Sequence, residues 1–168
     1  MESSDFELIF ASLEEEQVRY LVVGGVAVVL HGYPRFTADL DLVIALEPNN
    51  VLAAMRALQR LGYRPRAPVE LEQFADARIR GEWICDKGLT VFSLWSPAHP
   101  ATEVDVFVEE PFDFDEVFAR GIRAEVGGFV VSLIGVADLI EMKRRVGRPK
   151  DHEDVRVLQA LNEEDGSG

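Results

Sequence analysis

The sequence is poor in cysteine, in long apolar runs and in positive charge, and each shortage excludes a class of protein. Its single cysteine, Cys85, allows no internal disulfide bond, which is typical of a protein in the reducing cytoplasm. The longest apolar run, residues 21–30, is too short to span a bilayer and contains a Gly-Gly pair. The acidic N-terminus lacks the basic segment of a secretory signal. These features predict a cytoplasmic protein with no membrane partner.

Positive charge is scarce and local. The chain has 17 Lys and Arg against 30 Asp and Glu, so its formal net charge is −13. This balance argues against an extended nucleic-acid surface, because wrapping a nucleic acid requires a basic one. Residues 143–150, KRRVGRPK, are nonetheless strongly basic. A compact anionic ligand or the end of an RNA could bind there, and a solvated helix end is the ordinary alternative.

Composition and pattern predict one α+β domain. The 168 residues are 48% apolar and 28% charged, which suits a packed core. We assign residues 1–162 to a single domain and residues 163–168 to a frayed tail. Helices are predicted at 5–17, 25–30, 48–61, 112–118, 135–145 and 150–161, with one or two short ones in 70–87. Strands are predicted at 19–24, 39–46, 89–95, 102–108, 123–126 and 129–133, the last two forming a hairpin at Gly127-Gly128. Ser132 is the expected cap of the helix that follows it.

Aspartates on two of the predicted strands are candidates for metal binding. Asp39 and Asp41 alternate with leucines, so both carboxylates point to one face of their strand. Two carboxylates held side by side repel each other unless a cation lies between them. Asp105 lies between valines in EVDVF, and it would join the pair if the two strands are neighbours. Glu103 has the same parity as Asp105 and is the alternative third acid.

A glycine pair precedes the first aspartates along the chain. Gly24 and Gly25 end a predicted strand just before a helix, where a glycine backbone can approach a ligand closely and helix N–H groups favour anions. Three acids with two magnesium ions are the usual apparatus for attack on a nucleoside triphosphate. In such a site Asp105 would help to deprotonate the attacking hydroxyl.

These motifs together resemble a known superfamily. The segments are VVGGVAVVLHGYPRFTADLDLVI (22–44), GYRPR (62–66), EVDVF (103–107) and VADLIEMKRRVGRPKDHEDVRVL (136–158). They resemble the DNA polymerase β-like nucleotidyltransferases, and within them the small bacterial AbiEii-type group, which includes toxins of toxin–antitoxin pairs. The resemblance implies a nucleotidyltransferase fold like the polymerase β palm, with a mixed sheet flanked by helices and a helical C-terminal end.

The resemblance also implies ligands and roles. Mg²⁺, or Mn²⁺ in its place, would be bound in a two-metal site by the catalytic residues Asp39, Asp41 and Asp105. A nucleoside triphosphate such as ATP would contact Gly24 and Gly25. Many members have serine at the position of Gly25, so a phosphate-binding hydroxyl is missing here. The remaining candidates for phosphate binding are Arg35, Thr37 and Lys143, and for Arg35 an ion pair with a neighbouring acid is an equal alternative.

The expected activity is magnesium-dependent transfer of a nucleoside monophosphate from a triphosphate to an acceptor hydroxyl. The acceptor would be an RNA or tRNA end, a protein or a small molecule, and a toxin–antitoxin role with a cognate partner is also implied. The alternative is a catalytically silent protein of the same fold that binds a nucleotide or a partner. Two histidines and two tryptophans have ordinary expected roles: His31 as a helix cap, His99 exposed in a loop, and Trp83 and Trp95 in the core.

Overall fold

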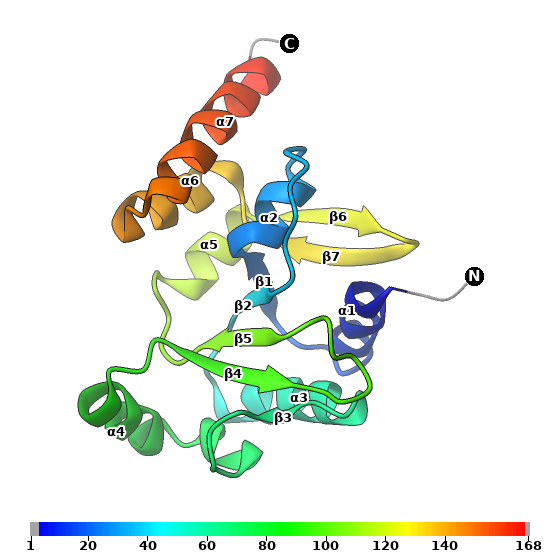
Figure 1. The fold of residues 1–168 in the computed structure, drawn as a ribbon, viewed down its shortest axis with the longest axis vertical. Coiled ribbons are helices and arrows are strands. Elements are labelled where there is room, and N and C mark those ends of the chain that lie inside the picture. Colours follow the sequence, from blue (N-terminus) through cyan, green and yellow to red (C-terminus); the bar gives the residue numbers. More distant parts are fainter. Residues whose placement is uncertain (1–3, 167–168) are drawn as a thin grey trace.

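One seven-stranded sheet organises the computed structural model, which describes residues 4–166 (Figure 1). The strand order is β3-β4-β5-β2-β1-β7-β6. The strands are β1 (Tyr20–Val23), β2 (Leu40–Ile44), β3 (Arg64–Pro65), β4 (Val91–Trp95), β5 (Val104–Phe107), β6 (Ile122–Val126) and β7 (Phe129–Leu133). The helices are α1 (Asp5–Glu15), α2 (Gly24–Leu30), α3 (Pro48–Arg60), the 3₁₀ helix η1 (Leu71–Ala75), α4 (Ala77–Lys87), α5 (Phe114–Arg120), α6 (Val136–Val146) and α7 (Pro149–Gly166).

The sheet is mixed, as predicted. Strand β2 runs antiparallel to β1 and parallel to β5, and β1 runs parallel to β7. Strands β6 and β7 form the predicted antiparallel hairpin around Gly127-Gly128. The short edge strand β3, which pairs with β4, is the one strand that the sequence pattern did not predict. With only two residues it offers no period from which a strand can be recognised.

The central strands are enclosed by helices. All four residues of β1 are buried, and four of the five in β2. Helix α2 packs against β1 and β2, while α6 contacts both α2 and α7. Helices α1 and α3 lie against each other, and Ser12 of α1 donates a 2.7 Å hydrogen bond to the backbone carbonyl of Ala57 in α3. This packing holds the ends of β1, β2 and β5 in fixed positions.

The two tryptophans differ in burial. Trp83 is buried and stacks on Phe92 with ring centroids 5.2 Å apart, which confirms its place in the core. Trp95 is only half-buried, and the guanidinium groups of Arg64 and Arg66 lie over its ring at 5.3 and 5.9 Å. The prediction of a core role for Trp95 is therefore wrong, because β4 has only the short β3 beyond it.

The structure tests three local predictions, for His31, His99 and Ser132. His31 is the C-cap residue of α2 by position, as predicted, but its side chain does not bind the carbonyls of that helix: Nε2 lies 2.7 Å from the carbonyl oxygen of Ile134, after β7. His99 is not exposed, because its Nδ1 lies 2.7 Å from an Asp5 carboxylate oxygen and its ring stacks on Tyr63. Ser132 does not cap α6, since its hydroxyl accepts a hydrogen bond from Arg123 and Gly135 is the N-cap residue.

The C-terminal helix is longer than expected. Helix α7 continues to Gly166, beyond the predicted end of the domain at 162, because no glycine or proline interrupts it earlier. Residues 167 and 168 of the predicted tail lie outside the described residues. Between residues 4 and 166, no helix is both long and apolar enough to cross a membrane.

Candidate active site

Strands β2 and β5 bring two carboxylates side by side. Asp41 and Asp105 are directly paired positions on these parallel neighbours, so their side chains project from the same face of the sheet. Asp39 immediately precedes β2 and shares the parity of Asp41. The sequence indicated that these strands hold the acids, and the sheet order makes the strands adjacent.

The electrostatics of Asp41 reflect this crowding. Burial, followed by the negative charges of Asp105 and Asp39, raises the pKa of Asp41 to about 7, against the opposing effect of Lys143 and Lys150. The site therefore carries negative charge that the surrounding cations do not fully compensate. A divalent cation would relieve this repulsion.

Asp105 has a partner that sequence reasoning missed. Ser93 on β4 pairs with Asp105 across the sheet, and its hydroxyl donates a 2.6 Å hydrogen bond to the Asp105 carboxylate. Burial raises the pKa of Asp105, and the bond from Ser93 works in the opposite direction. Only the cross-strand register identifies Ser93, because nothing in the sequence aligns β4 with β5.

Glu103, the alternative third acid, is engaged elsewhere. Its carboxylate forms an ion pair with Arg66 at the edge of the sheet. It contributes to neither of the two pockets described below, whereas Asp105 lines one of them. The geometry thus favours Asp105 over Glu103 as the companion of Asp41.

The glycine turn lies against the same aspartates. Gly24 has a φ of +67°, a left-handed conformation that favours glycine, and a Cβ atom there would lie 2.1 Å from an Asp41 carboxylate oxygen. At Gly25, a Cβ atom would lie 2.8 Å from Thr37 Oγ1 and 2.9 Å from Arg35 Nη2. Both positions therefore keep the backbone close to the side chains of the candidate site.

Two pockets meet at this point. The smaller, of about 230 Å³, is lined by Gly25, Thr37 and Asp39 together with the cations Arg35 and Lys150. The larger, of about 530 Å³, contains Asp105 and mainly apolar side chains: Val91, Phe107, Leu139, Met142 and Val146. Both pockets are lined by Gly24, Asp41, Lys143 and Arg148.

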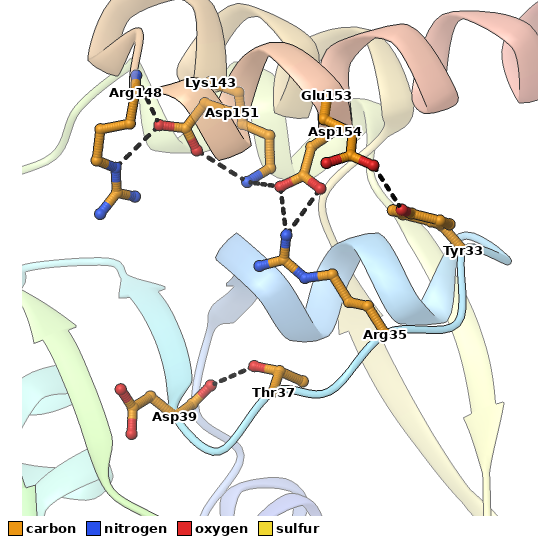
Figure 2. Close-up of polar contacts among 9 residues, drawn as sticks. All are labelled: Tyr33, Arg35, Thr37, Asp39, Lys143, Arg148, Asp151, Glu153 and Asp154. Carbon is orange, nitrogen blue, oxygen red and sulfur yellow. Dashed lines mark hydrogen bonds and ion pairs between the residues drawn. The ribbon is translucent and has the colours of Figure 1, made fainter.

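Behind the smaller pocket the basic residues are held by acids of α7 (Figure 2). Arg35 forms an ion pair with Asp154, which is the ordinary alternative that its sequence position left open. Lys143 is buried and forms ion pairs with Asp151 and Asp154. Burial alone would raise the pKa of Asp151, but hydrogen bonds from the Arg148 side chain and backbone hold it below its usual range.

The sequence did not single out Asp151 and Asp154 as partners of these cations. Their i, i+3 spacing on a helix that follows a basic segment is the signal that could have found them.

The donors at the acidic end of the site suit a magnesium ion, although they do not form a closed cage. Carboxylate oxygens are hard ligands of the kind that Mg²⁺ and Mn²⁺ prefer. Within residues 4–166, no three His, Cys, Asp or Glu side chains are grouped closely enough to hold a metal ion by themselves. Magnesium usually retains several water ligands and binds through one or two carboxylates plus substrate phosphates, so this open arrangement fits it.

Comparison with known proteins identifies the fold. No family model and no curated sequence matches the chain. The lincosamide antibiotic adenylyltransferase LnuA, solved with lincomycin, is similar with a TM-score of 0.62 at 15% identity, over 96% of this chain and 99% of that one. ANT(2'')-Ia in complex with adenylyl-2''-tobramycin gives a TM-score of 0.54 at 15% identity, over 91% and 84%.

An antigenic nucleotidyltransferase-like protein from Paracoccidioides brasiliensis is also similar, with a TM-score of 0.54 at 19% identity, over 94% of this chain and 76% of that one. Identities this low establish a common fold and no more. The mixed sheet, its flanking helices and these likenesses together show that the chain has the nucleotidyltransferase fold, as its sequence motifs predict.

Proposed function

We propose that this protein is a magnesium-dependent nucleotidyltransferase of the polymerase β-like superfamily. It transfers a nucleoside monophosphate from a triphosphate, such as ATP, to an acceptor hydroxyl and releases pyrophosphate in the cytoplasm. One observation carries the proposal: Asp41 and Asp105 are paired on parallel strands beside Gly24, whose left-handed backbone leaves no room for a side chain against the Asp41 carboxylate.

The acidic residues Asp39, Asp41 and Asp105 would hold the metal. Burial first, and then the charges of Asp105 and Asp39, raise the pKa of Asp41, and a bound cation would favour its charged form against both effects. Bound Mg²⁺ would lower the pKa of the attacking hydroxyl and neutralise charge on the leaving pyrophosphate. Asp105 lines the larger pocket and, with a pKa raised by burial, can accept the proton of the acceptor hydroxyl.

The smaller pocket suits the triphosphate. Backbone N–H groups of Gly24 and Gly25, the Thr37 hydroxyl and the cations Arg35 and Lys143 are the groups that bind phosphate oxygens. The larger pocket adjoins it at Gly24 and Asp41, and its apolar lining suits the parts of the substrates that carry no phosphate. The reacting phosphorus would then lie at Asp41, which belongs to both.

The acceptor is a hydroxyl of an RNA or tRNA end, a protein or a small molecule. A small molecule is supported by the size of the larger pocket and by the antibiotics bound to LnuA and ANT(2'')-Ia. Membership of the AbiEii-type group, and a toxin–antitoxin role with a cognate partner, are supported by the sequence resemblance alone. Growth of cells that express wild type or Asp41→Ala tests toxicity: equal growth with both soluble proteins contradicts it.

Labelling with radioactive nucleotides tests the activity. Wild type is incubated with each of the four α-labelled triphosphates, Mg²⁺ and cell extract, and the label is followed into RNA, protein and small molecules. Asp41→Asn and Asp105→Asn are expected to lose about 10²-fold or more of the transfer rate, since each removes a group that acts on the reacting atoms. Glu103→Gln is the matched control, because it removes an acid of the same segment outside both pockets.

Equal labelling by wild type and Asp41→Asn with every nucleotide would contradict the proposal. Loss of transfer in Glu103→Gln but not in Asp105→Asn would make Glu103 the third acid.

A catalytically silent nucleotide-binding protein is the second candidate. Gly25 favours it, because many similar proteins have a serine there and this chain lacks that hydroxyl. Calorimetry separates the two functions. Nucleotide binding without pyrophosphate release supports the silent protein, and binding accompanied by release supports the enzyme.

A further inference from the structure

Asp154, on α7, is shared by two cations of the smaller pocket. It is buried, with 1% of its surface exposed. Arg35 Nη1 donates to both of its carboxylate oxygens at 2.7 Å, and Lys143 Nζ lies 2.9 Å from Oδ2 (Figure 2). One carboxylate therefore links the segment between α2 and β2 to helix α6.

The two cations are held beside the glycine turn by this acid. Arg35 Nη1 faces Asp154, while Nη2 lies 2.9 Å from the place that a Cβ atom of Gly25 would occupy. Arg35 Nε is buried and, among the described residues, has no hydrogen-bond partner. A buried donor without a partner costs free energy, so the guanidinium needs a strong anchor to remain there. The contact of Arg35 with both Asp154 oxygens supplies it.

Such an anchor affects ligand binding through entropy. Free Arg and Lys side chains lose much of their rotamer freedom when they are fixed. If Asp154 already fixes them, that loss occurs on folding and not on binding. The negative charge of Asp154 acts in the other direction, since it repels a phosphate. The two effects predict opposite results when the charge is removed.

We infer that Asp154 is a positioning residue that holds Arg35 and Lys143 ready for the triphosphate. The inference rests on the proposed function and extends it to a residue outside both pockets. Asp154 is paired with Arg35 and Lys143, and the neighbouring Asp151 with Lys143 and Arg148. With Lys150, four cations at the pocket therefore face these two buried acids of α7. Repulsion by Asp154 is thus largely compensated, and the effect of orientation prevails.

The test measures binding of inorganic tripolyphosphate with Mg²⁺ by titration calorimetry. Asp154→Asn is expected to weaken this binding about tenfold or more, although the pocket becomes more positive. Glu153→Gln is the matched control. It removes the same charge from the preceding residue of α7, whose exposed carboxylate accepts a 3.3 Å hydrogen bond from Tyr33. Its affinity should equal or slightly exceed that of wild type.

A second variant keeps the inference testable if Asp154→Asn does not fold. Asp154→Glu keeps the charge but moves the carboxylate, so positioning predicts weaker tripolyphosphate binding at unchanged charge. A purely structural role for Asp154 would lower the melting temperature of this folded variant and leave its affinity unaltered.

The outcomes separate the inference from the proposed function. If wild type binds tripolyphosphate and the folded Asp154 variants bind it equally or more tightly, the positioning role is wrong and the proposed function stands. If wild type binds neither tripolyphosphate nor any nucleoside triphosphate, the proposed function fails, and the positioning role fails with it.

Discussion

A threonine hydroxyl lies beside Gly25, the position at which the sequence resemblance would place a serine. Thr37 Oγ1 is 2.8 Å from where a Cβ atom of Gly25 would be, so it borders the space that a serine side chain would enter. Its bond to the carbonyl oxygen of Asp39 is long, at 3.4 Å, which leaves the hydroxyl available to a ligand. If the proposed function holds, we expect the Thr37 hydroxyl to serve in place of a serine at position 25.

Removing the hydroxyl at residue 37 and adding one at residue 25 tests whether Thr37 takes the role of the absent serine. Thr37→Ala is expected to weaken tripolyphosphate binding roughly three- to tenfold, because a hydrogen bond to a charged group is lost. Adding Gly25→Ser to Thr37→Ala should restore part of the affinity, because the serine supplies a hydroxyl next to the position that the Thr37 hydroxyl has left. Gly25 has no left-handed φ, so serine causes no backbone strain there. Its Cβ atom would lie 2.9 Å from Arg35 Nη2, so the guanidinium must shift and the recovery of affinity is only partial.

The control for this exchange is Thr37→Ser, which keeps the hydroxyl and should bind as wild type does. Unchanged binding by Thr37→Ala, measured by calorimetry, would contradict a ligand role for the hydroxyl.

Helix α4 depends on few side chains for its attachment to the sheet. Only Arg80 and Trp83 are buried among its residues. Trp83 stacks on Phe92 of β4, which also stacks on Phe74 at 4.9 Å. Arg80 donates to the carbonyl oxygen of Phe74. The stacked rings of Phe74, Trp83 and Phe92 are therefore the buried part of this attachment, to which the partly buried Ile79 and Ile84 add.

Truncation of the tryptophan should loosen the helix selectively. Trp83→Ala is expected to lower the free energy of unfolding by about 3–5 kcal/mol, because it removes a buried aromatic side chain and leaves a cavity. Urea unfolding gives the magnitude, and hydrogen exchange should show α4 to be the least protected element of the variant. Cys85→Ala, an exposed change on the same helix, should stay within about 0.5 kcal/mol of wild type. A loss below about 1 kcal/mol for Trp83→Ala would mean that other contacts hold α4.

At the scale of the whole molecule, the candidate site opposes folding. The sheet places Asp41 beside Asp105 and within reach of the charge of Asp39, and burial together with this repulsion disfavours the charged form of Asp41. Folding must therefore hold negative charges near one another when no cation is present. Such a site is expected to reduce stability while it serves binding.

Removal of one charge should make the metal-free protein more stable. In EDTA at pH 8, Asp41→Asn is expected to raise the free energy of unfolding by about 1 kcal/mol, or the melting temperature by roughly 2–4 °C. Mg²⁺ should raise the melting temperature of wild type but not that of the variant, because it then lacks a ligand. A lower melting temperature for Asp41→Asn in EDTA would show that the carboxylate contributes to stability instead.

Much of this fold follows from local pattern. Alternation of leucine and aspartate predicted that Asp39 and Asp41 share a face, and the valines around Asp105 predicted its orientation in the same way. Gly127-Gly128 indicated the hairpin, and Pro48 the start of α3. These features depend on residues close in sequence, where backbone geometry alone links the pattern to the structure.

The long-range partners of such residues could not be predicted from the sequence. Three contacts join residues far apart along the chain: the hydrogen bond of Ser93 to Asp105, the contact of His99 Nδ1 with Asp5 and the ion pair of Arg35 with Asp154. Nothing local indicates which strand lies beside which, or which acid a given arginine meets. Sheet order and helix docking determine such contacts.

The sequence by itself determined the candidate acids, the glycine turn and the elements that carry them, because side-chain alternation and glycine geometry act over a few residues. Only the tertiary structure decided that β2 and β5 are neighbours, that Thr37 lies against Gly25, and that α7 supplies the acid for Arg35 and Lys143. Burial of the apolar faces of the sheet and helices selects those long-range pairings, and a linear pattern does not encode which of the possible packings buries them best.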